Sequence, residues 1–363
     1  MTRTILAAAL LLTLGTGCSK SGGGGDEGGL PGSKKSGASG GSANLTGAGA
    51  TFPFPLYTKW ISEFTKGHAG LKINYQSIGS GGGIRQITER TVDFGASDAP
   101  MNDEQISRAP GILHIPTCLG AVVLTYNLEG VPSGLKITPE AAAGIFLGKV
   151  KAWDDPLLQK ENPEIKLPSK SISSVHRSDG SGTTKIFVDY LSAVSPDWKN
   201  GPGSGTSVNW PSGLGAKGNE GVSGQIQSTP GAVGYVELVY ATQNKMSYAA
   251  IRNAAGKFVL PTLESVTAAA AGGLARMPED FRISIVNAEG EASYPISGFT
   301  YLLVYKEQKD AAKGKALVDF LKWSTNEGQK LTTDLSYAPL PDALVKKIDA
   351  TIATITGPGG KAL

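Results

Sequence analysis

Histidine, cysteine and excess charge are all scarce in this sequence of 363 residues, and each scarcity excludes a class of protein. The 3 histidines, His68, His114 and His176, lie far apart and form no grouping that could hold zinc. Lys and Arg total 34 against 31 for Asp and Glu, so the basic surface expected of a nucleic-acid-binding protein is missing. Any anion that this protein binds must therefore be held by a local site, and we expect no metal or other cofactor.

A long apolar run is also missing. The N-terminal run Ile5–Leu14 has only about half of the roughly 20 residues that a membrane-spanning helix needs. Basic Arg3 precedes this run and small residues follow it up to Cys18, which is the pattern of a secretory signal. We predict that residues 1–17 are a signal peptide and that Cys18 is lipidated, so that the protein is exported to the periplasm or cell surface and anchored to a membrane. Gly15 departs from the bulky aliphatic residue usual three places before such a cysteine.

Residues 18–44 consist almost wholly of Gly, Ser and charged residues, a composition that cannot bury enough apolar surface to order itself. We predict a flexible tether. A G-x-S-x-G match at 37–41 lies within it, without the strand and helix that a hydrolase elbow requires. The second cysteine, Cys118, lies in an apolar stretch, where we expect a small buried side chain. It has no disulfide partner if Cys18 is lipidated.

The rest of the chain alternates between strand and helix patterns and is long enough for two domains. Residues 71–76 alternate apolar and polar side chains, whereas 120–127 and 301–305 are continuous apolar runs typical of strands covered on both faces. Thr138, followed by Pro139, predicts the start of a helix. Further helical stripes are Leu56/Trp60/Phe64, Ile84/Ile87/Val92, Phe187/Tyr190/Leu191/Val194 and Leu317/Phe320/Leu321. This alternation indicates the α/β class.

Three turns of glycine and hydroxyl residues stand directly before helical stripes, at 47–52, 79–83 and 179–184. A helix N-terminus presents unpaired N–H groups and the positive end of the helix dipole, and glycine lets an anion approach the backbone closely. One such turn is ordinary helix capping, but three in one chain favour an anion site. Arg177 lies beside the third turn and could hydrogen-bond to an oxyanion, with Asp179 orienting its guanidinium. Alternatively, Arg177 and Asp179 form a plain surface ion pair.

Evidence for an enzyme is weak. The phosphate-binding loop of nucleotide hydrolases is absent, and Ser181 could act as the nucleophile of a secreted phosphatase or esterase only with a base that the sequence does not identify. In the segment 93–98, Asp93 or Asp98 alone would be read as a turn or capping residue. We therefore expect a binding protein that makes and breaks no bond.

Several longer motifs follow one another between about Leu45 and about Asp349. They are LTGAGATFPFPLY, NYQSIGSGGGIRQI, TVDFGASDAP, FLGKVKAWDDP, VHRSDGSGTTKIF, VNWPSGLGAKGNEG and TPGAVGYVE. Together they resemble the periplasmic phosphate-binding proteins of the phosphate-specific (Pst) ABC transporter. The resemblance implies a two-domain α/β solute-binding fold, type II-like, with a ligand cleft between domains joined by a two-strand hinge.

The resemblance also implies boundaries and ligands. Domain I would comprise 45–118 plus 297–363 and domain II 119–296, with crossings near Leu119–Val122 and Ile296–Thr300. The phosphate ligands implied are Thr51, Phe52 through its N–H, Ser80, Asp98, Arg177, Ser181, Gly182 and Thr183, with Asp179 holding Arg177. Gly81 stands where the family often has a second serine.

This ligand set predicts how phosphate is chosen. Helix N-termini and hydroxyls replace the lost hydration of the anion without adding net charge. Phosphate near neutral pH still carries a proton that Asp98 can accept, whereas sulfate has none. We therefore expect a monomer that binds inorganic phosphate and delivers it to the permease and ATPase subunits of an ABC transporter. Another tetrahedral oxyanion, such as sulfate or molybdate, and a secreted phosphatase remain the alternatives.

Overall fold

The computed structural model describes residues 43–363. The predicted signal peptide (1–17), Cys18 and nearly all of the predicted tether (18–44) lie outside these residues. Within the described part of the chain, no helix combines the length and the apolar character needed to cross a bilayer.

One mixed sheet forms the framework. Its strands in spatial order are β2 (Lys72–Ser77), β1 (Asn44–Gly49), β3 (Phe94–Ser97), β12 (Ser297–Tyr305), β4 (Ile112–Tyr126), β8 (Ala232–Glu237), β6 (Ser173–Arg177) and β7 (Leu214–Ala216). Strand β9 (Ser247–Tyr248) pairs with the end of β4, and β11 (Phe258–Val259), β10 (Ala250–Arg252) and β5 (Lys136–Ile137) form a small separate sheet. β1, β2 and β3 are parallel, β6, β7 and β8 are parallel, and β12 and β4 join the two sets by antiparallel pairing.

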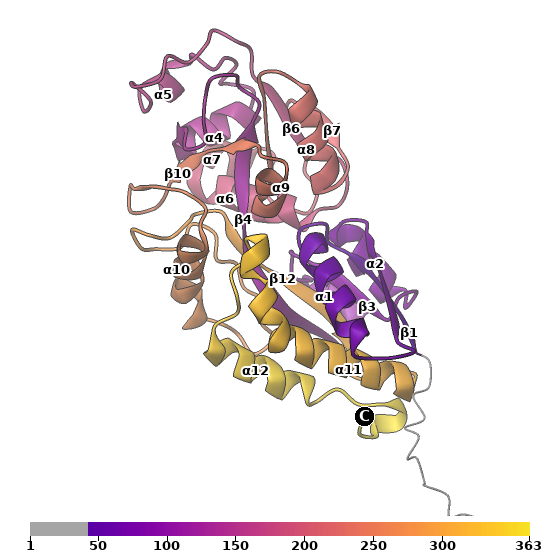
Figure 1. The fold of residues 1–363 in the computed structure, drawn as a ribbon. Helices are drawn as coiled ribbons and strands as arrows, with labels where there is room; N and C mark the ends of the chain where they lie inside the picture. Colours follow the sequence, from indigo (N-terminus) through magenta and orange to yellow (C-terminus); the bar gives the residue numbers. More distant parts are fainter. Residues whose placement is uncertain (1–42) are drawn as a thin grey trace, which may run out of the picture. The chain divides into compact units, whose positions relative to one another are not determined.

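Strand β4 changes its neighbour half-way along. Its residues Ile112–Ala121 pair with β12, and its residues Val122–Tyr126 pair with β8. We call the part around β1, β2, β3 and β12 the first lobe and the part around β6, β7 and β8 the second lobe. In Figure 1, β4 runs from the indigo and yellow helices of the first lobe to the magenta and orange helices of the second.

Helices surround both lobes. The first lobe carries α1 (Phe54–Lys66), α2 (Ser80–Thr88), α3 (Asp103–Arg108), α11 (Ala311–Thr325), α12 (Asp342–Ile352) and the 3-10 turns η1 (Glu327–Leu331), η2 (Thr333–Leu335) and η3 (Pro358–Gly360). The second carries α4 (Pro139–Phe146), α5 (Pro156–Gln159), α6 (Gly182–Val194), α7 (Pro196–Asn200), α8 (Gly218–Ser228) and α9 (Leu238–Gln243). α10 (Leu263–Leu274) packs on β4 and β12.

The predicted helical stripes explain most of these helices. Leu56, Trp60 and Phe64 are buried on one face of α1, and the stripes at 187–194 and 317–321 lie in α6 and α11. Helix α4 begins at Pro139, and the hydroxyl of Thr138 accepts a hydrogen bond from its first turn at 3.2 Å, as the sequence predicts. The α/β class is therefore confirmed.

Two sequence predictions need correction. Val92 is not part of a helix, because α2 ends at Thr88 and Arg90 adopts a left-handed conformation with φ of 55°. The apolar run at 120–127 is only the second half of β4, whose first half contains Pro116. A proline cannot donate to a strand ladder, and the register shifts by one residue beside it, between Thr300 and Tyr301.

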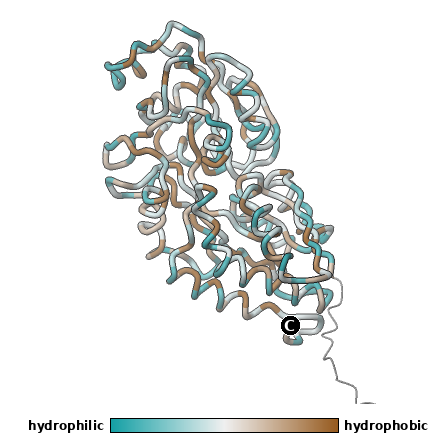
Figure 2. Tube along the Cα trace, in the orientation of Figure 1, coloured by the Kyte–Doolittle hydropathy of each residue, from teal (hydrophilic) through white to brown (hydrophobic). Residues whose placement is uncertain are grey.

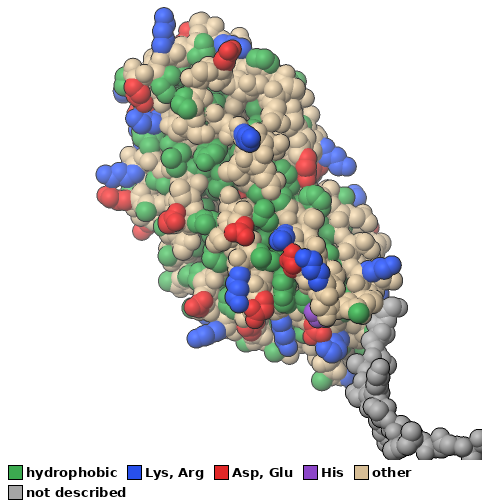
Figure 3. Space-filling view, viewed as in Figure 1, with side chains coloured by type: hydrophobic (Ala, Val, Ile, Leu, Met, Phe, Trp, Pro, Cys, Tyr) green, Lys and Arg blue, Asp and Glu red, His purple; other side chains and the backbone are tan. Residues whose placement is uncertain are grey.

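The core is continuous across both lobes. The tube in Figure 2 is brown, and therefore apolar, mainly along the inner strands and on the inner sides of the helices. Cys118 lies in this core and is fully buried, as expected. The face in Figure 3 shows Lys and Arg interspersed with Asp and Glu, so no charge of one sign dominates it.

Candidate anion-binding site

The three glycine and hydroxyl turns of the sequence meet where the two lobes touch. The N–H of Gly182, at the start of α6, donates to Ser80 Oγ at 3.0 Å. The N–H of Gly81, in the first turn of α2, donates to the carbonyl of Gly180 at 2.9 Å. The N-termini of α2 from the first lobe and α6 from the second therefore face each other directly.

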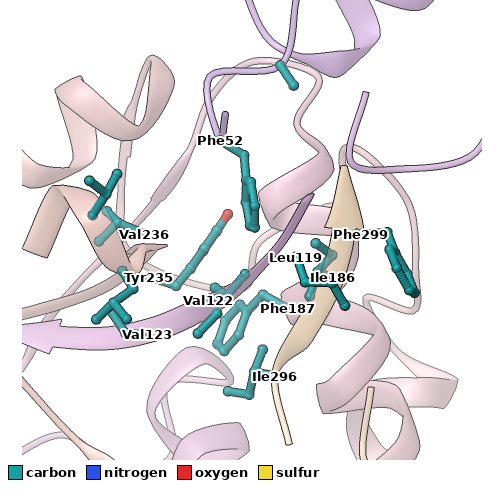
Figure 4. Packing of buried hydrophobic residues seen from close by; sticks show 14 of the residues in the cluster. Phe52, Leu119, Val122, Val123, Ile186, Phe187, Tyr235, Val236, Ile296 and Phe299 are labelled. Carbon is teal, nitrogen blue, oxygen red and sulfur yellow. The ribbon is translucent and has the colours of Figure 1, made fainter. Parts of the chain in front are cut away.

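The first of the three turns contains Thr51 and Phe52, and tyrosines from elsewhere in the fold hold its backbone. The hydroxyl of Tyr240 donates to the Thr51 carbonyl at 2.5 Å, and the hydroxyl of Tyr337 donates to the Phe52 carbonyl at 2.6 Å. The ring of Phe52 points toward β4 (Figure 4), and a Cβ on Gly120 of that strand would lie 2.6 Å from the ring. Within residues 43–363, the N–H of Phe52 has no hydrogen-bond acceptor, so this turn offers a backbone donor.

Asp98 follows β3 and is 4% exposed. Its Oδ1 accepts a hydrogen bond from the hydroxyl of Thr300 at 2.8 Å. Its Oδ2 lies 3.4 Å from Ser80 Oγ, and its own N–H donates to the same Ser80 Oγ at 3.2 Å. The carboxyl group is therefore fixed by Thr300 of strand β12 on one side. Its Oδ2 has only a long contact within the described residues and can accept a further hydrogen bond.

Burial raises the pKa of Asp98 from 3.8 to about 7, and the hydrogen bond from Thr300 and the charge of Arg177 only partly offset this effect. Burial thus makes the charged form of Asp98 less favourable than it would be in water, and a hydrogen bond donated to the carboxylate counteracts this effect.

This raised pKa predicts a pH dependence of stability in phosphate-free buffer. Between pH 3.8 and about 7 the folded protein keeps the Asp98 proton that the unfolded chain has lost. The stability that this proton contributes is complete below pH 3.8 and is lost as the pH rises through about 7. Denaturant unfolding across this range should therefore show wild-type stability falling relative to Asp98→Asn. A constant difference between the two proteins would contradict the buried-acid interpretation.

Arg177 ends β6, and its side chain is 1% exposed. Its Nε and Nη2 donate to the two oxygens of Asp179 at 2.7 and 2.6 Å, and its Nη1 lies 3.5 Å from Thr183 Oγ1. Burial disfavours the charged form of Asp179, but the hydrogen bonds and the charge of Arg177 outweigh burial and lower the pKa of Asp179. Asp179 also accepts the N–H of Gly218 at 3.0 Å. The plain surface pair considered from the sequence is excluded.

Ser181 is the N-cap of α6, and its Oγ accepts the N–H of Thr184 at 3.0 Å. The structure therefore brings Thr51, Phe52, Ser80, Asp98, Arg177, Asp179, Ser181, Gly182 and Thr183 to one place. Their ligand roles stay a prediction. His176, which we did not assign to the site, instead stacks on Trp210 with ring centroids 4.7 Å apart.

Positions 79 and 182 require glycine, because neighbouring atoms lie where a Cβ would be. Gly79 has φ of 86°, and a Cβ there would lie 2.3 Å from Asp179 Oδ2. A Cβ on Gly182 would lie 2.5 Å from Ser80 Oγ and 2.6 Å from Asp98. At Gly81, a Cβ would lie 3.1 Å from Gly180 Cα, so the glycine permits tight contact between the lobes.

Gly182→Ala should weaken ligand binding without unfolding the protein. The added methyl group would push the N-terminus of α6 away from Ser80 and Asp98, and overpacking of this kind costs about 1–3 kcal/mol, or roughly 10- to 100-fold in affinity. Titration calorimetry with phosphate measures the loss. Gly224→Ala is the matched control, because a Cβ at that helical position meets nothing within 4 Å. Equal affinities for the two variants would contradict the close contact.

Sequence reasoning missed several residues of the site: Asn219, Gly218, Thr300, Tyr240, Tyr337 and Glu237. Asn219 and Gly218 open α8 within a motif that carried the family resemblance, so a signal existed but no role was assigned to it. Thr300 and Tyr337 lie more than 200 residues from the groups they contact, and no local pattern points to them.

A cavity of about 240 Å³ opens beside Asp98. Its lining includes the cations Lys185 and Arg282 and also the carboxyl groups of Asp98 and Asp189, and Lys185 pairs with Asp189. A wider groove of about 950 Å³, lined by parts of α1, α8 and α9, contains none of the predicted ligands. Within residues 43–363 no group of His, Cys, Asp or Glu is arranged to hold a metal ion.

Comparison with known proteins agrees with this arrangement. The model of the PBP superfamily domain matches residues 34–327. The Phosphate-binding protein PstS of Xylella fastidiosa (strain 9a5c) is 49% identical over 310 residues, which cover 85% of this chain and 85% of that protein. This chain belongs to the PstS family. The PstS protein of Pasteurella multocida (strain Pm70) is 44% identical over 321 residues, covering 88% of this chain and 93% of that protein.

The fold of this PstS-family chain is also that of solved structures. The phosphate-binding protein from Stenotrophomonas maltophilia shares it with a TM-score of 0.67 at 19% identity, over 88% of this chain and 99% of that one. At this identity the likeness concerns the fold alone. The expectation of a two-domain periplasmic solute-binding fold is confirmed, whereas the individual ligand roles within this PstS-family chain are not tested by these comparisons.

Proposed function

We propose that the protein binds inorganic phosphate between its two lobes and delivers it to an ABC transporter for import. The observation that carries this proposal is the meeting of two kinds of group at one place. Donors come from both lobes, and the acceptor is the carboxyl group of Asp98. Ser80 links that carboxyl group to the N–H of Gly182. Thr183 faces Arg177, and Asn219 links Thr183 to Thr51. An anion that also carries a proton satisfies such a set, and the PstS relatives are named for binding phosphate.

The electrostatics favour capture without a strong net charge. The guanidinium of Arg177 is paired with Asp179 over 2.6 Å, so most of the binding must come from oriented N–H and O–H groups. Such groups replace the lost hydration of a buried anion and need no reorganisation when it arrives. This mode of binding suits a chain with a formal net charge of only +3.

Division of the donors between two lobes would couple binding to closure. We propose that 45–118 plus 297–363 and 119–296 are the two domains and that β4 and β12 are the hinge. The change of neighbour along β4 after Ala121 supports this division. A ligand that contacts both lobes shifts the population toward the closed form, and the transporter would recognise that form.

Export and anchoring belong to the same proposal. The signal sequence and Cys18 support a lipoprotein that is held at a membrane by its tether, in the periplasm or at the cell surface. The permease and ATPase subunits of a phosphate transporter would be its partners, and the ligand-binding unit would act as a monomer.

Titration calorimetry of protein freed of phosphate by unfolding and refolding tests the function. We expect tight one-to-one binding of phosphate and weak or absent binding of sulfate. Equal binding of both ions would favour the general oxyanion alternative, and absent binding of phosphate would reject the proposal.

A phosphatase is the alternative from another class, and the geometry gives it little support. Ser181 Oγ is occupied as the cap of α6 and accepts the N–H of Thr184. No histidine or second carboxylate of the described residues hydrogen-bonds to Ser181. A chromogenic phosphate ester should therefore not be hydrolysed.

A further inference from the structure

Asn219 is a fully buried amide at the start of α8, and it contacts both lobes. Its Oδ1 accepts the backbone N–H of Glu237 at 3.0 Å. Because that N–H can only donate, the amide oxygen must face it and the NH₂ group must face the opposite way. The orientation of the side chain is thus set by β8.

The NH₂ group of Asn219 points at the hydroxyl of Thr51 in the first lobe. Thr51 Oγ1 accepts from Asn219 Nδ2 at 2.7 Å and from the backbone N–H of Asn219 at 3.2 Å. A hydroxyl oxygen has two lone pairs, and both are used here. The Thr51 hydroxyl can therefore only donate, and its hydrogen has no acceptor within residues 43–363.

The hydroxyl of Thr183 in the second lobe is held in the same way. Its Oγ1 accepts from Asn219 Nδ2 at 3.1 Å and faces Arg177 Nη1 at 3.5 Å. Neither nitrogen can accept a proton, since an amide NH₂ and a guanidinium are donors only. The Thr183 hydroxyl is therefore also confined to donating.

We propose that Asn219 is a positioning residue that confines the hydroxyls of Thr51 and Thr183 to donating, so that this end of the site accepts only unprotonated oxygens. The inference rests on the proposed function. The ligand proton is thereby directed to the opposite end, where Asp98 accepts it. Together, Asn219 and Asp98 make binding depend on the number of protons that the anion carries and on their positions.

The expected consequence is selectivity between protonation states of one ligand. Monohydrogen phosphate can place its single O–H at Asp98 and present bare oxygens to the two threonines. Dihydrogen phosphate must bring a second O–H to groups that cannot accept it, and an unmatched buried donor costs about 1–3 kcal/mol, or roughly 10- to 100-fold in affinity. Wild-type affinity should therefore fall as phosphate gains its second proton. Asp98 is protonated over the same pH range, so the contribution of Asn219 is the difference between wild type and Asn219→Ala at each pH.

Two variants of Asn219 test this role by calorimetry with phosphate between pH 5 and 8. Asn219→Ala removes the amide donor from both hydroxyls and leaves each with one longer contact, to the backbone N–H of residue 219 and to Arg177. Each hydroxyl can then also accept a proton, so we expect about 10- to 100-fold weaker binding at pH 8 and a smaller loss at pH 5. Asn219→Asp keeps the shape and the acceptor for Glu237 but attracts the hydroxyl hydrogens away from the ligand. Asn219→Asp should lose more phosphate affinity at pH 8 than Asn219→Ala does. It also tests the positioning role if the alanine variant fails to fold.

Controls separate positioning from simple support of the fold. Asn162 is also fully buried, and among residues 43–363 its side-chain amide hydrogen-bonds only to Lys136 and Leu158 of the second lobe. Asn162→Ala should therefore leave phosphate affinity and its pH profile unchanged. In a protein that already carries Thr51→Val and Thr183→Val, adding Asn219→Ala should lower phosphate affinity by at most about 2-fold further. The hydroxyls that Asn219 positions are absent from that protein.

The outcomes test phosphate binding and the positioning role of Asn219 separately. If wild-type protein does not bind phosphate, the proposed function fails. If it binds phosphate but Asn219→Ala shifts affinity equally at every pH, or costs as much in the double-valine background, the positioning role is overturned and the proposed function stands.

Discussion

Asp98→Asn should bind phosphate and sulfate with similar affinity, whereas the wild-type protein should prefer phosphate by roughly 10⁴- to 10⁵-fold. The reason is the second oxygen of the carboxyl group. Thr300 occupies Oδ1 at 2.8 Å, while Oδ2 has only the long 3.4 Å contact to Ser80 and is free to accept the proton of phosphate. Sulfate has no proton to offer, so two buried acceptors would face each other unbridged.

An amide at this position removes the preference. It offers an NH₂ group that can donate to any oxyanion, so the penalty against sulfate disappears. Calorimetry with both ions measures the ratio. Asp93→Asn is the matched control, because Asp93 comes from the same sequence motif but binds Lys313 at 2.9 Å on the outer side of the first lobe. If Asp98→Asn kept the wild-type ratio, proton acceptance would not be the source of selectivity.

The local parts of the site were accessible from the sequence. A glycine and hydroxyl turn before an apolar stripe marks a helix N-terminus wherever it occurs, so Ser80 and Ser181 could be placed on helix ends without a structure. The pairing of Arg177 with Asp179 spans only two residues, and its identity was expected, although its burial was not.

The long-range parts were not accessible. Asn219 meets Thr51 across 168 residues of sequence, and Thr300 meets Asp98 across 202. Such contacts depend on the order of strands in the sheet, where β12 comes to lie between β3 and β4. Periodicity reports which face of an element is buried, but not which element covers it.

Irregular backbone limited the prediction in a different way. The first half of β4 contains Pro116, a residue that argues against a central strand, so only the second half was expected. The register shift beside the proline resolves the conflict, and Thr117, the residue skipped in the pairing, donates through its hydroxyl to the Thr300 carbonyl at 3.2 Å. The irregularity lies one residue from Cys118, within the strand that we propose as part of the hinge.

Arg177→Ala should weaken phosphate and sulfate alike, by about 10²- to 10³-fold. Removal of one partner of a buried, hydrogen-bonded charge pair costs roughly 2–5 kcal/mol, in part because the other charge stays behind. Here that charge is Asp179, which would be left with the N–H of Gly218 as its remaining hydrogen bond from outside its own loop. Its unpaired carboxylate would also repel the incoming anion.

A second substitution separates these two effects. Arg177→Ala combined with Asp179→Asn removes the stranded charge, so thermal stability should recover toward the wild-type value. Affinity should recover only in part, because the guanidinium donor is still missing. Arg252→Ala controls for loss of a cation, since Arg252 pairs with Glu140 on the surface at 3.0 Å. Full recovery of affinity in the double variant would show that Arg177 serves only to neutralise Asp179 and makes no contact with the anion.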